Sequence, residues 1–317
     1  ARRTHNRALK SNMRARACAS RAIPRAAIAP RRANARSTTR TARSIAARAS
    51  REEEMMAKLM GMMGLGGDGI VAAADALPGR AQAMRVSDQH YVLKGHAMRA
   101  PFPENLERAT FATGCFWGTE KMFWRVPGVY TTAVGYVGGH TPNPTYEEVC
   151  SGSTGHTECV KVTYDPRKVS FADLLAMHWT CHDPTQGNRQ GNDRGTQYRS
   201  GIYCDTEAQL AVAKDSAEAY SEALKAAGKN GAITSEIKGP GDTFYYAEDY
   251  HQQYLAKPRS RPYCSAQPTG VPVPEAWLKA NGAKFGAGYW KTFGPAPGCT
   301  INVPNAPVTL EEALAAN

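Results

Sequence analysis

The chain has 317 residues, 42% of them hydrophobic, and carries a formal net charge of +11 from 39 Lys and Arg against 28 Asp and Glu. Residues 1–51 hold 14 Arg, one Lys and no acidic residue, so the other 266 residues have a net charge of −4. The charge therefore does not indicate a nucleic-acid-binding domain, which needs a basic patch on its folded part. The composition excludes disorder for the bulk, and the apolar stretch 59–67 is far shorter than the ~20 residues of a membrane-spanning helix.

The first 51 residues combine Arg, Ala, Ser and Thr without the apolar core of a secretory signal. This composition predicts an organellar transit peptide, to the chloroplast or alternatively the mitochondrion, with a cytoplasmic protein expected if the segment is not cleaved. A retained basic arm that binds nucleic acid is the other interpretation, but the segment has no aromatic residue to stack on bases. Residues 52–100, rich in Met and Gly at their start, are predicted to form a linker and an N-terminal extension.

Regular patterns begin after residue 100 and predict one domain over 101–258. Alternation indicates strands, Ser170 with Asp173 forms a capping box, and Thr206 caps a long Ala-rich helix that ends at Gly228. The order β-α-β-β-α-β followed by a helix and a strand predicts an α+β fold, a ferredoxin-like two-layer sandwich, with an irregular C-terminal tail over 259–317. The predicted strands are 109–113, 129–136, 158–166, 200–206 and 232–237, and the predicted helices are 115–126, 170–180 and 206–227.

The eight cysteines are widely spaced and none forms a C-x-x-C pair. This pattern favours reduced thiols or redox chemistry, although structural disulfides stay open. Cys115 lies at a predicted strand-to-helix junction, where unpaired backbone N–H groups and the helix dipole favour a thiolate. Gly114 and Gly118 leave space around its sulfur, and Phe116 and Trp117 follow it as candidate walls of an apolar pocket.

The chain resembles the A-type peptide methionine sulfoxide reductases in five motifs that together cover about half of its length. They are GCFWGTE (114–120), GYVGG (135–139), TYEEVCSGSTGHTECVKVTYDP (145–166), HDPTQGNRQGNDRGTQYRS (182–200) and FYYAEDYHQQYL (244–255). The resemblance implies reduction of methionine S-sulfoxide, free or in proteins, because the two sulfoxide epimers need separate enzymes.

The resemblance also implies a role for each matching residue. Sulfoxide reduction needs a nucleophile, a proton for the departing oxygen and an apolar seat for the methyl group. For Glu158, burial beside aromatic residues would raise the pKa enough for a general acid, whereas an exposed strand carboxylate is the alternative. The implied roles are the nucleophile for Cys115, the methyl pocket for Phe116 and Trp117, holding and protonating the oxygen for Glu158, Tyr146 and Tyr198, and contact with the substrate backbone for Asp193.

A second thiol has to regenerate Cys115 after attack, because the product on the enzyme is a sulfenic acid. Cys264, in an RPYCS context, resembles the family's resolving cysteine. Where relatives carry a further recycling cysteine this chain has Pro272 and Val273, so that role is empty or falls to Cys299. The resemblance implies thioredoxin or a similar dithiol protein as reductant and oxidised methionine-containing proteins as substrates. We expect a monomer without cofactor or metal, and no nucleic-acid or membrane partner.

Three alternatives remain open from the residues. His178, Cys181 and His182 share one face of a predicted helix, as metal ligands do, but a structural zinc site needs a fourth ligand. A cysteine hydrolase or acyl transferase would use Cys115 with His156 or His251 as base. A binding module for methionine sulfoxide without catalysis would not need the thiol.

Overall fold

The computed structural model describes residues 69–295 and 300–317. The predictions of a transit peptide over 1–51 and of a linker up to residue 68 lie outside these ranges, as does Cys299. All described residues belong to one compact unit, Ser50–Asn317. Within them, no helix is long and apolar enough to cross a membrane.

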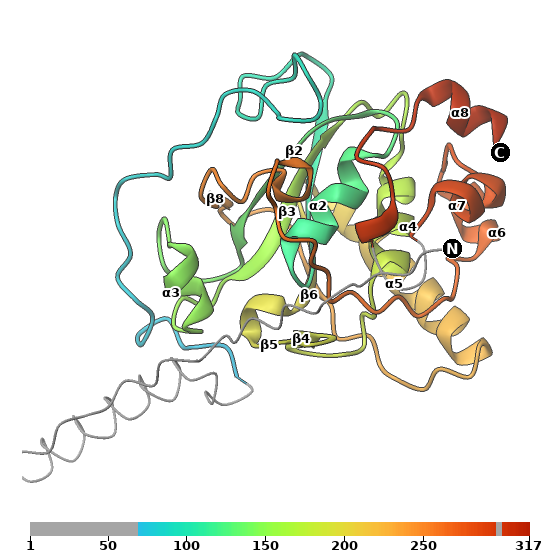
Figure 1. Ribbon diagram of the computed structural model, residues 1–317. Coiled ribbons are helices and arrows are strands. Elements are labelled where there is room, and N and C mark those ends of the chain that lie inside the picture. Colours follow the sequence, from blue (N-terminus) through green and yellow to red (C-terminus); the bar gives the residue numbers. More distant parts are fainter. Residues whose placement is uncertain (1–68, 296–299) are drawn as a thin grey trace, which may run out of the picture. The chain divides into compact units, whose positions relative to one another are not determined.

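A six-stranded sheet in the order β7-β6-β1-β3-β2-β8 forms the centre of this unit (Figure 1). Neighbouring strands run antiparallel except β6 and β7, which are parallel. The two strands of each β-α-β unit are not neighbours: β3 lies between β1 and β2, and β1 lies between β3 and β6. The resulting inner order β6-β1-β3-β2 confirms the predicted ferredoxin-like core. The strands are β1 (Glu107–Thr113), β2 (Val129–Val137), β3 (Thr157–Tyr164), β6 (Ser200–Cys204), β7 (Glu236–Lys238) and β8 (Tyr245–Tyr246).

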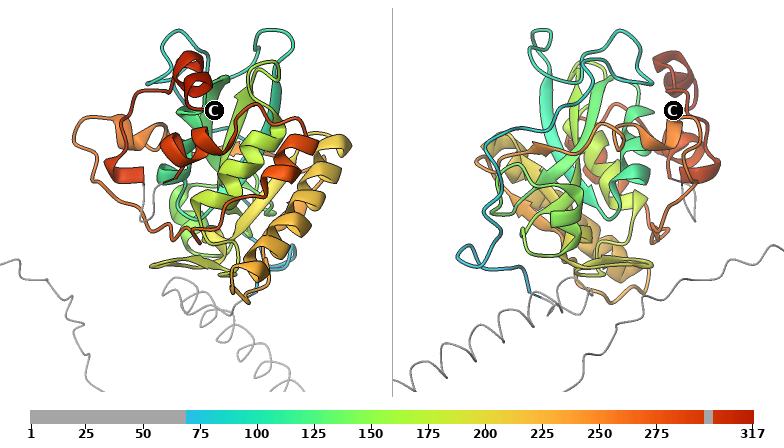
Figure 2. Two further views of the ribbon diagram at one scale, coloured as in Figure 1. Left: turned by 90° about the vertical axis from the view of Figure 1, so that its right-hand side faces the viewer. Right: turned by 60° about the vertical axis from the view of Figure 1, so that its left-hand side comes forward.

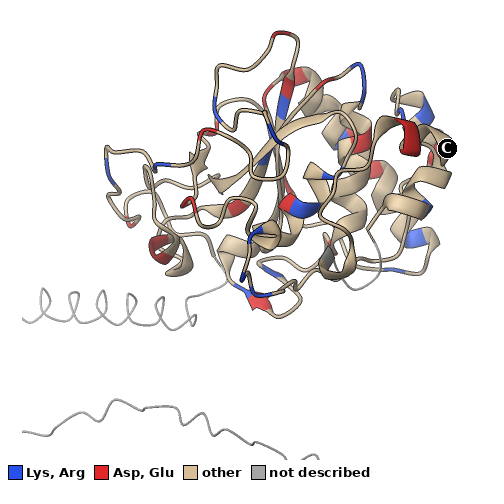
Figure 3. Ribbon diagram, turned by 45° about the horizontal axis from the view of Figure 1, so that its top comes forward, with Lys and Arg blue, Asp and Glu red and all other residues tan. Residues whose placement is uncertain are grey.

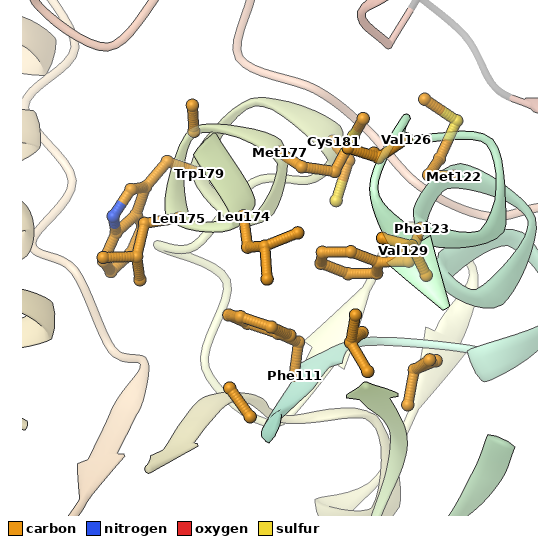
Figure 4. Packing of buried hydrophobic residues seen from close by; sticks show 14 of the residues in the cluster. Phe111, Met122, Phe123, Val126, Val129, Leu174, Leu175, Met177, Trp179 and Cys181 are labelled. Carbon is orange, nitrogen blue, oxygen red and sulfur yellow. The ribbon is translucent and has the colours of Figure 1, made fainter. Parts of the chain in front are cut away.

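Three helices cover one face of the sheet, α2 (Phe116–Trp124), α4 (Phe171–Cys181) and α5 (Glu207–Ala226) (Figure 2). The capping box predicted at Ser170 and Asp173 is present, and Thr206 caps α5. Phe111 of β1 stacks on Phe123 of α2 with ring centroids 4.7 Å apart. Figure 4 shows these two rings and Leu174 filling the space between the sheet and the helices. This core fixes the start of α2 relative to the sheet.

Several short elements were not predicted. The 5-residue helix α3 (Tyr146–Cys150) interrupts the connection from β2 to β3, and a small separate hairpin pairs β4 (Arg189–Gln190) with β5 (Asp193–Arg194). A 3-10 turn, η1 (Thr196–Tyr198), leads into β6, and another, η2 (Tyr254–Ala256), follows β8. The last predicted strand begins later than expected, at Glu236. These pieces are too short to produce a periodic pattern in the sequence.

The C-terminal tail is irregular only in its first part. Residues 259–274 have no helix or strand, but α6 (Glu275–Ala280), α7 (Ala287–Phe293), η3 (Thr300–Asn302) and α8 (Leu310–Ala315) follow. The backbone N–H groups of Lys284 and Phe285 donate to the carboxylate of Asp173, and the Trp124 indole donates to the carbonyl of Asn305 at 2.9 Å. The expectation of an irregular tail is therefore wrong beyond residue 274, because apolar side chains of this region pack on α2 and α4.

Charged residues of both signs are distributed over the described elements (Figure 3). The N-terminal extension contributes a buried histidine, His90, whose Nε2 lies 2.9 Å from the Thr132 hydroxyl. That hydroxyl donates to the buried carboxylate of Glu120 on α2 at 3.0 Å. The extension thus braces the helix that begins at the candidate site.

Candidate active site

Cys115 is the residue directly before α2, where β1 ends and the chain turns into the helix. Gly114 makes this turn with φ +93°, and a Cβ there would lie 2.6 Å from Cβ of Gln190 in the β4–β5 hairpin. A side chain at position 114 is therefore excluded by both conformation and space. The predicted strand-to-helix position of the thiol is confirmed.

The environment of Cys115 differs from the expected thiolate-stabilising one. Burial raises the pKa of the Cys115 thiol well above its usual value, and the charge of Glu158 raises it further. The backbone N–H of Trp117 lowers this pKa but is the weaker effect. The backbone N–H at the helix start favours the thiolate, as expected, but desolvation outweighs it, so the net pKa of the thiol is raised. When Glu158 is neutral, its charge no longer raises the pKa of the Cys115 thiol.

Glu158 lies on β3 with its side chain buried and its Oε2 accepting the backbone N–H of Phe116 at 3.0 Å. Burial raises the pKa of this carboxyl to about 8, with a smaller contribution in the same direction from the charge of Asp193. The predicted buried carboxyl with a raised pKa is confirmed, and at neutral pH it holds a proton. It lies next to the start of α2 and can donate that proton beside the thiol.

Tyr146 and Tyr198 come from α3 and η1 and lie near this carboxyl. Burial raises the pKa of each phenol, and the charge of Glu158 contributes to both. Both hydroxyls therefore stay protonated and can donate hydrogen bonds. Cys150, which the sequence did not single out, forms a hydrogen bond with the Tyr146 hydroxyl, and burial raises the pKa of this thiol to about 11.

Phe116 and Trp117 form an aromatic wall with residues of the segment after β8. Trp117 stacks on Tyr254 at a centroid distance of 4.0 Å, and its indole N–H donates to Nδ1 of His251 at 3.0 Å. The His251 ring also packs against Phe116 at 5.1 Å. Burial lowers the pKa of His251 to about 4, so this histidine is a neutral part of the wall.

The hydrolase alternative lacks a base in this arrangement. His251 uses Nδ1 to accept from Trp117. The other candidate, His156, accepts from the backbone of Gly139 at 3.1 Å and donates to the carbonyl of Thr141 at 2.8 Å. Within the described ranges, neither ring makes a hydrogen bond to Cys115, which a thiol–imidazole pair requires.

The metal alternative is likewise not supported by the geometry. His182 has both ring nitrogens engaged, Nδ1 with the carbonyl of His178 and Nε2 with the hydroxyl of Ser200, each at 2.7 Å. Burial lowers the pKa of His178 and of His182. Among the residues that the structure describes, no group of three or more His, Cys, Asp or Glu is arranged to hold a metal ion.

Cys264 and Cys115 line the same small cavity. Cys264 is disulfide-bonded, whereas Cys115 is a free thiol, so the two are not bonded to each other in this state. The other cysteine that faces the cavity is the buried Cys181 at the end of α4. The cavity is lined by Thr113, Cys115, Gly118, Thr119, Met122, Cys181, Cys264, Ser265 and Ala266.

Asp193 lies on β5 of the small hairpin. The resemblance implies that it contacts the substrate backbone, but here it accepts hydrogen bonds from the hydroxyls of Tyr263 and Ser265, the two neighbours of Cys264. Its charge acts on Cys115 and on Glu158, where it raises both pKa values. The structure thus brings together every predicted site residue that it describes.

Comparison with known proteins places this site in a family. A family model described as peptide methionine sulfoxide reductase matches residues 107–273. The chain belongs to this family. It is 59% identical over 202 residues to the peptide methionine sulfoxide reductase MsrA of Rhodospirillum centenum, a match that covers 64% of this chain and 90% of the relative. Its identity to MsrA 1 of Synechocystis sp. is 57% over 205 residues, covering 65% and 90%.

A solved structure agrees with these matches. Methionine sulfoxide reductase A of Corynebacterium diphtheriae superposes with a TM-score of 0.58 at 44% identity, covering 65% of this chain and 100% of that one. In this peptide methionine sulfoxide reductase, the match to the family model runs from the start of β1 to Val273. The N-terminal extension and helices α6 to α8 lie outside that match.

Proposed function

We propose that the protein reduces methionine S-sulfoxide, free or in proteins, at Cys115 and so repairs oxidised proteins. The observation that carries this proposal is the free Cys115 thiol beside the buried carboxyl of Glu158, whose pKa is about 8. A nucleophile next to a proton donor that is still protonated at neutral pH is what sulfoxide reduction needs. The aromatic wall of Phe116 and Trp117 offers an apolar seat for the methyl group.

In the first step, the Cys115 sulfur attacks the sulfoxide sulfur, Glu158 gives its proton to the sulfoxide oxygen as the bond from that oxygen to the substrate sulfur breaks, and the thiol proton of Cys115 passes to the Glu158 carboxylate. Tyr146 and Tyr198 hold that oxygen by donating hydrogen bonds. Oxygen passes from substrate to enzyme, so the products are methionine and a sulfenic acid on Cys115. The S epimer follows from the family resemblance and not from the geometry.

In the second step, the Cys264 thiol condenses with the sulfenic acid, which releases water and forms a Cys115–Cys264 disulfide. A further thiol then attacks Cys264, which frees Cys115 and moves the disulfide away from the nucleophile. The state with Cys264 disulfide-bonded and Cys115 free supports such an exchange. We assign the further thiol to Cys299, and thioredoxin or a similar dithiol protein to the final reduction.

Thiol trapping with mass spectrometry tests this sequence. Reduced protein receives one equivalent of methionine S-sulfoxide, and thiols are alkylated at successive times. We expect a Cys115–Cys264 bond first and a Cys264–Cys299 bond later. The Cys264→Ser variant should make one methionine and stop with a sulfenic acid on Cys115, and Cys299→Ser should lose only recycling by thioredoxin. Dithiothreitol should restore turnover in both, because a small thiol attacks oxidised sulfur directly.

Cys204→Ala is the matched control, because it removes a buried free thiol of β6 that does not line the cavity. It should behave as the wild type. A Cys115–Cys299 bond without any Cys115–Cys264 bond at any time would show that Cys264 is not the resolving cysteine.

We further propose that residues 1–51 direct the protein to the chloroplast, with the mitochondrion as the alternative. The support is the Arg-rich, acid-free composition of this segment. Fusing residues 1–51 to a fluorescent protein tests the proposal. Import into either organelle with loss of the segment distinguishes the two, and a fusion that stays in the cytoplasm contradicts both.

A further inference from the structure

The tail on both sides of Cys264 lies on the β4–β5 hairpin. The hydroxyl of Tyr263 donates to one oxygen of Asp193 and the hydroxyl of Ser265 donates to the other. The two donors flank Cys264 in sequence, so one carboxylate holds the chain on both sides of this cysteine. Both carboxylate oxygens of Asp193 therefore accept hydrogen bonds from the tail.

Packing between the tail and the hairpin is close enough to fix this arrangement. Gly191, at the turn of the hairpin, has φ +59°, and a Cβ there would lie 2.2 Å from the carbonyl oxygen of Ser265. The backbone N–H of Gln267 donates to Oε1 of Gln190 at 3.0 Å, and Gln186 donates to Gln267 at 3.0 Å. The backbone of the tail thus packs closely against the backbone of the hairpin, and several hydrogen bonds join the two segments.

The docked tail also reaches the aromatic wall. The ring of Tyr263 meets Trp117 edge-on at a centroid distance of 6.3 Å. The hairpin under the tail contacts the nucleophile's turn as well, through Gln190 against Gly114. One small hairpin therefore holds the tail, the wall and the start of α2 in a common position.

Fixed points on either side of this contact confine any movement to a short loop. The Tyr254 hydroxyl accepts the backbone N–H of Arg261 at 3.1 Å. Beyond the contact, the Tyr220 hydroxyl of α5 pairs with Thr269 at 2.7 Å and with the carbonyl of Val271 at 3.1 Å. Release of Asp193 requires rearrangement only between Arg261 and Thr269, so it does not require unfolding.

We propose that Asp193 acts as a gate, because it can bind either the substrate backbone or the tail but not both at once. When Cys264 is in its disulfide, Asp193 binds the tail. This inference rests on the proposed function and on the family resemblance, which implies that Asp193 contacts the substrate backbone. In the oxidised state Cys115 is a free thiol again, yet no reduced Cys264 remains to condense with a new sulfenic acid. A tail that competes with substrate in this state protects Cys115 from an oxidation that could not be resolved.

The test compares two successive turnovers without reductant. The first uses the fully reduced protein, and the second uses protein that has received one equivalent of methionine S-sulfoxide and that mass spectrometry shows to have a bonded Cys264 and an alkylatable Cys115. We expect KM for the second turnover to exceed that for the first by about tenfold, the effect of one hydrogen bond to a charged group.

The double variant Tyr263→Phe, Ser265→Ala removes both hydroxyls and keeps the aromatic ring, and it should bring the two KM values to within about twofold of each other. Thr269→Val is the matched control, because it removes a tail hydroxyl that bonds Tyr220 and not Asp193, and it should keep the wild-type ratio. Equal KM values in wild type, or an unchanged ratio in the double variant, overturn the gate. Absence of methionine in the first turnover contradicts instead the proposed function.

Discussion

Cys115 and Cys264 line the same cavity, but the segments that carry them are held in different ways. Cys115 is positioned by the junction of β1 and α2, and its neighbour Glu158 by a central strand. Cys264 lies in a stretch without helix or strand, held by its disulfide, by side-chain hydrogen bonds to Asp193, and by contacts of the tail with the β4–β5 hairpin.

The site therefore has a fixed part, the β1–α2 junction with Cys115 and Glu158, and a replaceable part, the tail around Cys264 whose contacts can be exchanged. Main-chain hydrogen bonds and core packing form cooperatively, and moving one of them costs many others. Two hydroxyl–carboxylate bonds can be exchanged for bonds to a substrate at little net cost. Changes near Cys115 should therefore affect oxygen transfer directly, whereas changes near Cys264 should affect the resolution of the sulfenic acid and, once Cys264 is in its disulfide, the binding of the next substrate.

The largest expected effect is that of Cys115→Ser. A hydroxyl is both a far weaker nucleophile and a far weaker acid than a thiol, so methionine formation should fall by about 10⁴-fold or more while the fold is retained. Single-turnover assays with circular dichroism as a folding check measure this. Activity above about a hundredth of wild type, a barrier change of only ~2.7 kcal/mol, would point to another nucleophile.

Next in size is Glu158→Gln. Glutamine keeps the shape of the side chain but has no transferable proton, so the oxygen-transfer rate should fall roughly 10²- to 10⁴-fold. Alkylation of Cys115 should persist, because the thiol is unchanged. Glu147→Gln, at an exposed residue of α3, is the control and should have little effect. An unaltered single-turnover rate in Glu158→Gln would move the proton donor to Tyr146 or Tyr198.

The pH profile should show a smaller effect from the same carboxyl. Because the pKa of Glu158 is about 8, the oxygen-transfer rate should fall about tenfold per pH unit above that value, and the fall should be absent in Glu158→Gln.

The raised pKa of Glu158 also makes the stability of the fold depend on pH. The free energy of unfolding that the protonated Glu158 contributes is complete below pH 4.5, the ordinary pKa of this carboxyl, and is lost as the pH rises through about 8. Denaturant unfolding at pH 5 and pH 9 checks the sign.

Gly191→Ala should give the smallest effect and test the replaceable part. The added Cβ would meet the Ser265 carbonyl, so the tail should dock less well and the Cys115–Cys264 bond should form about tenfold more slowly. Gly187→Ala is the matched control, since φ there is +68° but no atom lies within 4 Å of the added Cβ. A slower oxygen-transfer step in Gly191→Ala, with no change in Gly187→Ala, would mean that the two parts are not independent.

The sequence alone determined the core of the fold and the placement of the nucleophile. Alternation and helical periodicity, the capping box at Ser170 and the cap at Thr206 are local signals, and local hydrogen bonding decides such elements. The position of Cys115 at the start of α2 follows from the same signals. The buried state of Glu158 was inferred from the family resemblance, since a glutamate in a strand is equally compatible with exposure.

Only the tertiary structure decided the electrostatics of the site and the state of the tail. The raised pKa of Cys115 is the sum of desolvation and charges from β3 and β5, segments that no local pattern connects to residue 115. The bonds of Tyr263 and Ser265 to Asp193 join positions about 70 residues apart, and the helices after residue 274 form against α2 and α4. Periodicity describes what a segment does with itself, whereas burial and pairing depend on which distant segments the fold brings beside it.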